Sequence, residues 1–409
     1  MERIKLLIGR IAGSLWFLPA LYAAGAIALV FAAPLAEFIV PEALAEAIEE
    51  DAIRTILNVL SSSLLAVTIF SLTTMATSLK AVSDAATPRA RPILIRGGGA
   101  QNAIATFLGA FIFSMIGLVA LNSGFLGTGG EAMLFALTVL ATLMVVVVLI
   151  QWIRQLSTLG DVEDAISKVE IATRDALLAL TCEPPSADSS VLGSGKPHAL
   201  CAARPGYIQM IDLRALDKAA ARLGVSVEVA ALPGDRCGPA LELARVYGAD
   251  NARTAEKLLP CFVRGDGRTL EADPRLGLTA LSEIGSRALS SGINDPGSAV
   301  SAIRALERCF AVWSEAVRKA DDREGLSCVV YPDLDAAAAL RAPVVALARD
   351  GASQLEVMRA LLELCATVGR LPGLGLAAEV KALTREILQR ASAAMAHKSD
   401  ITRLKDALY

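Results

Sequence analysis

Four long apolar runs occupy the first part of the chain, and none contains a charged residue. They extend over about residues 15–33, 56–79, 103–121 and 133–152. A helix rises 1.5 Å per residue, so about 20 apolar residues cross the hydrocarbon core of a bilayer. The pattern predicts a transmembrane domain of four helices within residues 1–154. A cleaved signal peptide is the alternative for the first run, because Ala32-Ala33-Pro34 follows it.

The helical spacing of apolar positions continues past residue 154, and the period changes from residue 206. A helical spacing continues to about residue 180 and is followed by a stretch rich in Pro, Ser and Gly, so residues 155–205 are predicted to be a helical extension and linker. Residues 206–265 predict a small α/β module with a strand at 206–212, a helix at 213–223 and a strand at 225–232. Apolar stretches at 241–246 and 259–263 would complete its sheet, and Gly265-Asp-Gly267 is a hairpin signal.

Residues 266–409 predict a mainly helical region. The predicted helices cover about residues 274–289, 296–318, 334–349, 353–368 and 376–397. The predicted fold class is therefore a membrane α-helical domain with four transmembrane helices, followed by an α+β cytoplasmic domain that is mostly helical toward the C-terminus.

Charges between the apolar runs predict the orientation of the chain. The loop after the first run is acidic, the loop after the second carries Lys80, Arg89, Arg91 and Arg96, and Arg154 follows the fourth run. Because short cytoplasmic loops collect Lys and Arg, both termini are expected in the cytoplasm. The composition agrees with a bilayer protein, since 54% of residues are hydrophobic and the mean hydropathy is +0.52.

Hydroxyl side chains gather on one face of the second apolar run. At 100° per residue this face carries Ser63, Ser71, Thr74, Thr77 and Ser78, whereas Leu65 and Leu72 lie opposite. A functional interpretation is a hydrated pathway for an ion or solute. The alternative is helix packing, because small hydroxyl residues let helices approach closely.

Small residues form a stripe along the third apolar run. They are Thr106, Gly109, Ala110, Ser114 and Gly117. Such a stripe permits close approach of a neighbouring backbone, so the third run is predicted to be an interface helix.

Asn294-Asp295-Pro296 is the sharpest local signal in the second part of the chain. Asp is a good N-cap and Pro is favoured at the first helical position, so the sequence predicts a helix beginning at Pro296. Arg287 can pair with Glu283 at i, i+4 spacing. The functional alternative is that Arg287, Asn294 and Asp295 converge on a ligand or a subunit boundary.

The histidines, the cysteines and the net charge of the chain argue against several classes of function. The chain has two histidines, and its seven cysteines lack CxxC spacing, so neither a metal site nor a cofactor site emerges. Reduced thiols scattered through a cytosolic domain are expected. No nucleophile–base pair or phosphate loop is recognisable, so an enzyme is not expected. A net charge of −3 gives no basic field for nucleic acid.

Several stretches of the chain form an ordered set. They are Thr87-Pro-Arg89, Phe107-Leu-Gly-Ala-Phe111, Gly206-Tyr-Ile-Gln-Met-Ile-Asp212, Pro233-Gly-Asp235, Arg268-Thr269, Asp273, Gly277, Arg287-Ala-Leu-Ser290 and Gly292-Ile-Asn-Asp-Pro296. This set resembles the signature of DUF2254, a family of bacterial predicted membrane proteins, in the same order. Ser291 departs from the family, which usually has Pro there. The resemblance implies the architecture and a bacterial inner membrane, and it implies no established activity.

Two functions remain open from the sequence. The first is an oligomeric channel or transport-like protein, in which several copies share the hydroxyl face of the second run. No ionisable residue lies inside a run, which disfavours a proton-coupled carrier. The second is a membrane-anchored sensor or scaffold whose cytoplasmic domain binds a partner or small molecule. The lipid bilayer and further copies of the chain are the expected partners.

Overall fold

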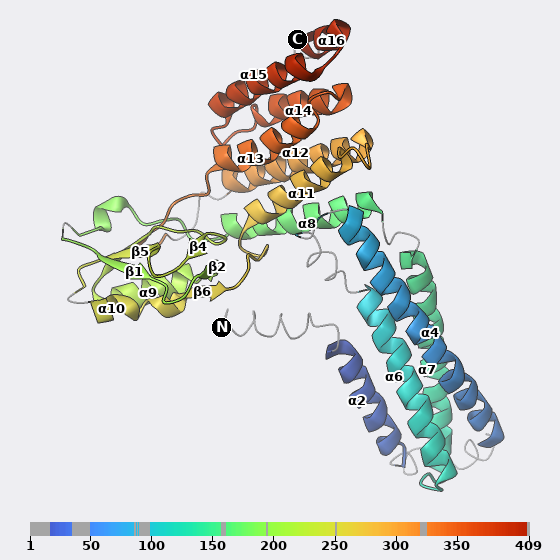
Figure 1. The fold of residues 1–409 in the computed structure, drawn as a ribbon. Helices are drawn as coiled ribbons and strands as arrows, with labels where there is room; N and C mark the ends of the chain where they lie inside the picture. The colour runs from blue at the N-terminus through green and yellow to red at the C-terminus, as the bar shows by residue number, and fades with distance from the viewer. Residues whose placement is uncertain are drawn as a thin grey trace. The chain divides into compact units, whose positions relative to one another are not determined.

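The structure is a computed structural model that divides into two compact units. The first unit comprises residues 1–82 and 94–161, and the second comprises residues 83–93 and 162–409. Figure 1 shows the elements of both. The described residues are 17–34, 50–85, 87, 89, 99–156, 161–193, 195–249, 252–319 and 325–406; side chains 78, 79, 81–85, 99–101, 155 and 156 are not described.

Apolar helices make up the described part of the first unit. They are α2 (Phe17–Ala32), α4 (Glu50–Ala85), α6 (Gly99–Asn122) and α7 (Thr128–Leu156). Three segments among the described residues are long and apolar enough to cross a membrane, namely Glu50–Thr77, Asn102–Asn122 and Thr128–Arg154. The prediction of four transmembrane helices is not confirmed. Helix α2 has 16 described residues, fewer than a membrane span needs, and residues 15 and 16 of the predicted run are not among the described residues.

Helix α6 is the most buried of the three candidate spans. All five small residues of its predicted stripe are buried: Thr106, Gly109, Ala110, Ser114 and Gly117. A Cβ added at Gly109 would lie 2.9 Å from Cβ of Tyr22 on α2, and one at Gly117 would meet Leu134 of α7 and Leu57 of α4. The missing side chains therefore let three helices pack closely around α6.

The exposed side chains of α7 are mostly apolar, whereas α4 exposes both apolar side chains and polar ones such as Asn58, Ser63 and Thr77. Helix α7 exposes large side chains such as Leu140, Leu143 and Ile150, and α4 exposes Ile69 and Phe70. Exposure of these apolar side chains to water is unfavourable, whereas exposure to the apolar tails of lipids is not.

In the second unit, α8 (Val162–Thr181) leads into a segment predicted as a linker. That prediction is wrong in part, because the segment contains a 3-10 helix, η2 (Ser189–Val191), and a strand, β1 (His198–Cys201). Strand β1 pairs antiparallel with β5 (Glu242–Tyr247). Main-chain hydrogen bonds to β5 stabilise β1. The local composition of Pro, Ser and Gly cannot predict these bonds, because β5 lies about 45 residues away in the chain.

Two small sheets form the α/β module. One has the strand order β1-β5-β3-β7, with β3 (Ser226–Val229) parallel to β7 (Val329–Val330). The other has the order β4-β2-β6; its strands are β4 (Arg236–Cys237), β2 (Gly206–Ile211) and β6 (Phe262–Gly265). Helix α9 (Leu213–Leu223) buries Leu213, Leu216 and Ala220, while α10 (Ala252–Glu256) and the 3-10 helix η3 (Leu259–Cys261) precede β6. The module therefore extends beyond its predicted bounds of 206–265.

The predicted hairpin at Gly265-Asp-Gly267 is wrong. Strand β6 pairs with β2, and no described strand follows it before the next helix. The Gly267 carbonyl instead accepts a hydrogen bond from the Gln209 side chain at 2.9 Å. Glycine placement alone does not create a hairpin when the second strand is missing.

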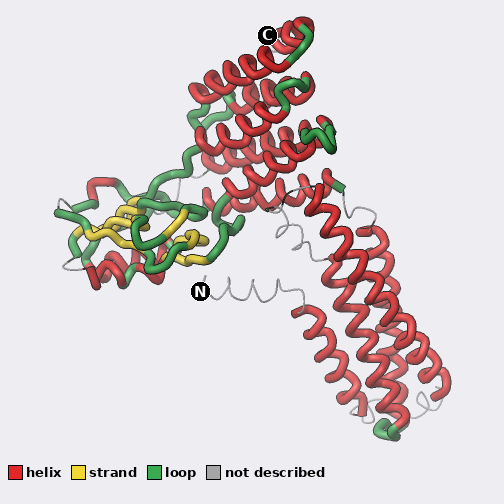
Figure 2. The backbone as a smooth tube through the Cα atoms, viewed as in Figure 1, coloured by secondary structure: helices red, strands yellow, loops and turns green. Residues whose placement is uncertain are grey.

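Helices form the rest of the second unit, as predicted. They are α11 (Pro274–Ala288), α12 (Pro296–Arg318), α13 (Ala336–Asp350), α14 (Leu355–Val368), α15 (Ala377–Ala394) and α16 (Lys398–Asp406). Figure 2 shows this helical region beside the strands of the module. Helix α11 packs against α8 where Gly277 faces Thr173, since a Cβ there would lie 2.0 Å from Thr173 Oγ1.

A charged contact joins α8 to α12. Arg308 donates two hydrogen bonds to the buried Glu170 carboxylate, from Nε to Oε1 at 2.8 Å and from Nη2 to Oε2 at 2.5 Å. Arg174 lies 3.5 Å from Glu170 Oε1. The contact supplies the partners that a buried carboxylate requires.

Asp295 is the N-cap of α12, as the capping interpretation predicts. Its carboxylate accepts from the Ser298 amide at 3.2 Å and from the Ser298 hydroxyl at 2.6 Å. The Ser298 hydroxyl, followed by the Ser298 amide, lowers the pKa of Asp295 below its ordinary value.

Asp295→Ala should lower the free energy of unfolding of the second unit by about 1 kcal/mol, as loss of an N-cap does. Because the folded pKa is depressed, this stabilisation is present at neutral pH and is lost as pH falls through the folded pKa, below about pH 4. Thermal unfolding at pH 7 and pH 3 measures both effects. Equal stability of the variant and the wild type at pH 7 would contradict the capping role.

Candidate functional site

Asp273 lies at the centre of a charged cluster in the second unit. It precedes Pro274, the first residue of α11, and its side chain is 1% exposed. Asp273 occupies the N-cap position, but its side chain does not cap the helix. The carboxylate is therefore available to partners outside α11.

Two arginines hold this carboxylate. Arg268 donates to Asp273 Oδ2 from Nε at 2.7 Å, and its Nη2 forms an ion pair with the same oxygen at 2.6 Å. Arg275 donates from Nε to Asp273 Oδ1 at 3.1 Å. Both carboxylate oxygens are satisfied, which makes burial of the charge tolerable.

Arg275 also reaches the turn Pro233-Gly-Asp235. Its Nη2 donates to the Pro233 carbonyl at 2.6 Å and to Asp235 Oδ1 at 3.0 Å. Burial alone would lower the pKa of the Arg275 guanidinium, but Asp273 and Asp235 outweigh it and raise the pKa. Arg275 therefore remains a cation that joins α11 to the α/β module.

Gly234 is required at this contact for two reasons. Its φ of +89° lies in the left-handed region, and a Cβ added there would lie 1.9 Å from Asp273 Oδ2. Its amide donates to the Ile208 carbonyl at 2.7 Å, which attaches the turn to β2. The glycine thus permits the turn to lie directly against the buried carboxylate.

A third segment meets the same cluster through Gln209 of β2. Its side-chain amide donates to the Gly267 carbonyl, and the Thr269 hydroxyl lies 3.4 Å from the Gln209 carbonyl. Three stretches quoted above for the DUF2254 resemblance, from residues 206–212, 233–235 and 268–273, therefore assemble at one place. Arg268 and Asp273 were predicted from the sequence and Arg275 was not, although a basic residue two positions after Asp273 could have indicated it.

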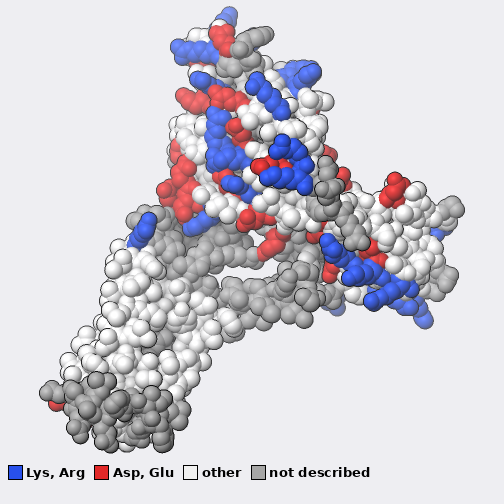
Figure 3. Space-filling view, turned by 180° about the vertical axis from the view of Figure 1, so that it is seen from behind, with Lys and Arg blue, Asp and Glu red and all other residues white. Residues whose placement is uncertain are grey.

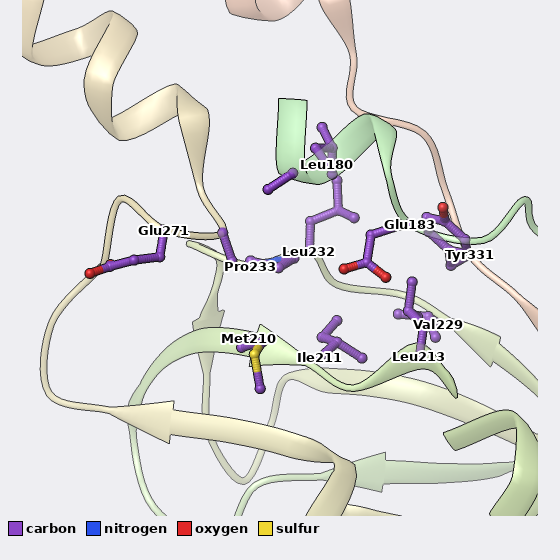
Figure 4. Close-up of a pocket in the computed structure, with 12 residues that line it drawn as sticks. Leu180, Glu183, Met210, Ile211, Leu213, Val229, Leu232, Pro233, Glu271 and Tyr331 are labelled. Atoms are coloured by element: carbon purple, nitrogen blue, oxygen red, sulfur yellow. The ribbon is translucent and has the colours of Figure 1, made fainter. Parts of the chain in front are cut away.

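A cavity of about 60 Å³ lies next to this cluster, and Pro233 belongs to both. Its lining is mostly apolar and comes from the end of α8, from β2, from β3 and from residues 271–272 (Figure 4): Ala179, Leu180, Glu183, Met210, Ile211, Leu213, Val229, Leu232, Pro233, Glu271, Ala272 and Tyr331. Figure 4 shows the Glu183 carboxylate among Leu232, Ile211 and Val229, whereas the Glu271 carboxylate points away from them. Sequence analysis did not identify this cavity, because its walls come from distant segments.

Arg287, Asn294 and Asp295 do not converge on a shared site. Asn294 has a φ of +48°, and its side-chain oxygen accepts from Gln354 Nε2 at 2.9 Å. Asp295 caps α12 at Pro296, and Arg287 is exposed. The contacts of Asn294 and Asp295 stabilise the loop between α11 and α12.

The predicted pairing of Arg287 with Glu283 is wrong for the described residues. Glu283 forms an ion pair with Arg89 and accepts from the buried Thr87 hydroxyl at 2.6 Å. This contact groups residues 83–93 with the second unit, whereas sequence analysis placed them in the transmembrane domain. A long-range partner replaces the local one because Thr87 and Arg89 together satisfy both carboxylate oxygens.

The residues of the predicted hydroxyl face of α4 differ in their burial. Ser71 is fully buried, Thr74 is half-buried, and Ser63 and Thr77 are exposed. The hydroxyls of Ser63, Thr74 and Thr77 donate to carbonyls four residues earlier at 2.6 to 2.9 Å. The side chain of Ser78 lies outside the described residues. Helical hydroxyls that bond their own backbone need no water, so this geometry fits the packing interpretation as well as a pathway.

The cysteines and acidic residues show no assembled reactive centre in the described part of the chain. Groups of three or more His, Cys, Asp or Glu side chains able to hold a metal are absent there. Burial raises the pKa of the Cys309 and Cys365 thiols to about 12, so these thiols are protonated at neutral pH.

Comparison with known proteins agrees with the resemblance. The chain is 25% identical over 395 residues to uncharacterized proteins of Mycobacterium bovis and Mycobacterium tuberculosis, covering 90% of this chain and 74% of each relative. No solved structure matches it. The family model described as "Predicted membrane protein (DUF2254)" matches residues 12–367. The chain therefore belongs to the DUF2254 family of predicted membrane proteins.

Proposed function

We propose that this protein is a membrane-anchored sensor or scaffold whose second unit binds a small molecule or a partner. One observation carries the proposal: segments that mark the family come together around Asp273, and a cavity adjoins them. The mostly apolar lining with a few polar groups is typical of ligand sites, and the volume of about 60 Å³ limits an occupant to a few atoms unless the walls move. We assign no catalytic step to it.

The candidate spans support an anchoring role. The exposed side chains of α7 are mostly apolar, α4 exposes Ile69 and Phe70, and α6 is packed on several sides. The hydroxyls of Ser63, Thr74 and Thr77 are satisfied within α4. A helix of this kind can face lipid without a hydrated pathway.

An oligomeric channel is the second candidate. The supporting observation is that Ser63 and Thr77 are exposed on the predicted hydroxyl face of α4, where a second copy of the chain could pack. In that arrangement several copies would share a polar lining. Homo-oligomerisation belongs to this candidate.

We propose a bacterial inner-membrane location with both termini in the cytoplasm. Basic residues such as Arg89 and Arg154 and the acidic loop of residues 35–51 favour that orientation. Reporters fused within residues 81–96 and 43–51 test it, because opposite signals are expected from the two sites.

Cysteine accessibility separates the anchor from the channel. After removal of the native cysteines, Cys at Ser63, Ser71 or Thr74 should stay unmodified by a polar thiol reagent if α4 is an anchor, because the reagent needs water. Cys at Leu65 and Leu72 on the opposite face are the matched controls. The wild-type protein should also give no current steps in planar-bilayer recording.

Modification with the periodicity of the hydroxyl face, together with current steps, would overturn the anchor proposal and favour the channel. A further variant carries Cys at Ser78, near the end of the predicted span; reaction confined to that Cys would indicate exposure at the membrane surface and leave the anchor in place.

A further inference from the structure

Helix α9 carries a row of basic residues along its exposed face. Arg214, Lys218 and Arg222 follow one another at i, i+4 and i+8, and all three are exposed. The opposite face of α9 is buried in the module through Leu213, Leu216 and Ala220. This spacing places the three cations on the same side of the helix.

These cations lack carboxylate partners among the described residues. By contrast, arginines of the helical region such as Arg304, Arg308 and Arg341 are ion-paired. Asp217, the acidic residue within α9, accepts from the backbone amides of Ser327 at 3.0 Å and Cys328 at 2.7 Å and is committed to those contacts. The positive charge of the row on α9 is therefore not balanced by a described carboxylate in contact with it.

Two further basic residues of the module, Arg253 of α10 and Lys257, are also exposed, with the exposed Glu256 between them. Figure 3 shows Lys and Arg gathered along one edge of the α/β module. We define the basic face as Arg214, Lys218 and Arg222.

We propose that the basic face binds the anionic phospholipid headgroups of the bilayer that anchors the chain. Juxtamembrane clusters of Lys and Arg are attracted to anionic lipid surfaces. Only residues 157–161 separate α7 from α8, a connection of about 20 Å at full extension. The candidate spans thereby keep the second unit close to headgroups and raise their effective concentration. The chain's net charge of −3 gives no wider basic field of the kind that nucleic acid requires.

Photocrosslinking of the full-length protein in nanodiscs tests this proposal. Benzoylphenylalanine replaces the exposed Ala221, which lies beside Arg222 on α9. Nanodiscs contain phosphatidylcholine alone or with phosphatidylglycerol as about a third of the lipid, and mass spectrometry detects lipid adducts. We expect a several-fold higher yield with phosphatidylglycerol, falling at 1 M salt because the Debye length shrinks to about 3 Å.

A triple substitution, R214Q with K218Q and R222Q, should remove the adduct. Each basic residue near an anionic surface gives roughly a fivefold preference, so loss of three should lower the yield by tenfold or more. The matched control neutralises Lys381, Arg385 and Lys398, which are exposed on α15 and α16, and should leave the yield unchanged.

Equal yields in the two kinds of nanodisc, or an unchanged yield in the triple variant, would overturn the proposal. Loss of the adduct on adding a short DNA duplex, without dependence on phosphatidylglycerol, would assign the surface to nucleic acid and also overturn it. The lipid and salt comparisons use wild-type charges, so they remain decisive if the triple variant folds poorly. The proposal stands independently of the cavity and of any channel.

Discussion

Asp273→Ala should destabilise the second unit by about 3 kcal/mol, because it leaves two partly buried guanidinium groups without their shared carboxylate. Arg268 loses its described partner, whereas Arg275 keeps only Asp235 and the Pro233 carbonyl. Thermal and denaturant unfolding of the full-length protein measure the loss. The α/β module and α11 should separate more readily, since this cluster joins them.

Asp235→Ala is the matched control for this prediction. It removes one contact of Arg275 but acts on a carboxylate that is 38% exposed. Its cost should be about 1 kcal/mol, as for an ordinary hydrogen bond. Equal costs for the two variants would show that burial of Asp273 does not set the strength of the cluster.

Gly234→Ala tests the geometry of the same contact from the opposite side. The substitution combines a strained φ of +89° with a Cβ that would lie 1.9 Å from Asp273 Oδ2. In the Asp273→Ala background the steric part disappears and the backbone strain remains, so the two substitutions should be non-additive by about 1 kcal/mol or more. Additive costs would contradict direct contact.

Local signals in the sequence were sufficient for most helices of the second unit. Asp295-Pro296 defines the start of α12 because the cap and the fixed proline φ act within four residues. The burial of Gly109 and Gly117 also followed from spacing along one helix. In both cases the information lies within a few turns of the chain.

Features that depend on long-range pairing were not predictable from local pattern. Strand β1 forms only against β5, and the two residues of β7 pair with β3 from about 100 positions away. Glu283 was expected to pair four residues along its helix but binds Arg89 and Thr87 instead. Composition and periodicity contain no signal for such partners.

The charged contact between α8 and α12 should respond asymmetrically to loss of its two partners. Glu170 has a side chain that is 7% exposed, whereas that of Arg308 is 53% exposed. Arg308→Met leaves a buried carboxylate with only the 3.5 Å contact to Arg174, and it should cost about 2 to 3 kcal/mol. Glu170→Gln leaves an arginine that water can solvate, and it should cost about 1 kcal/mol.

The double variant, Arg308→Met with Glu170→Gln, separates the burial of charge from the loss of packing. Because it leaves no unpaired carboxylate in the interior, it should be more stable than Arg308→Met alone, although it carries one more substitution. Denaturant unfolding of the full-length protein gives the three free energies. A double variant with the lowest free energy of unfolding of the three would show that α8 and α12 are held mainly by the attraction between Arg308 and Glu170. That result would contradict the cost of burying Glu170 as the reason that Arg308 is required.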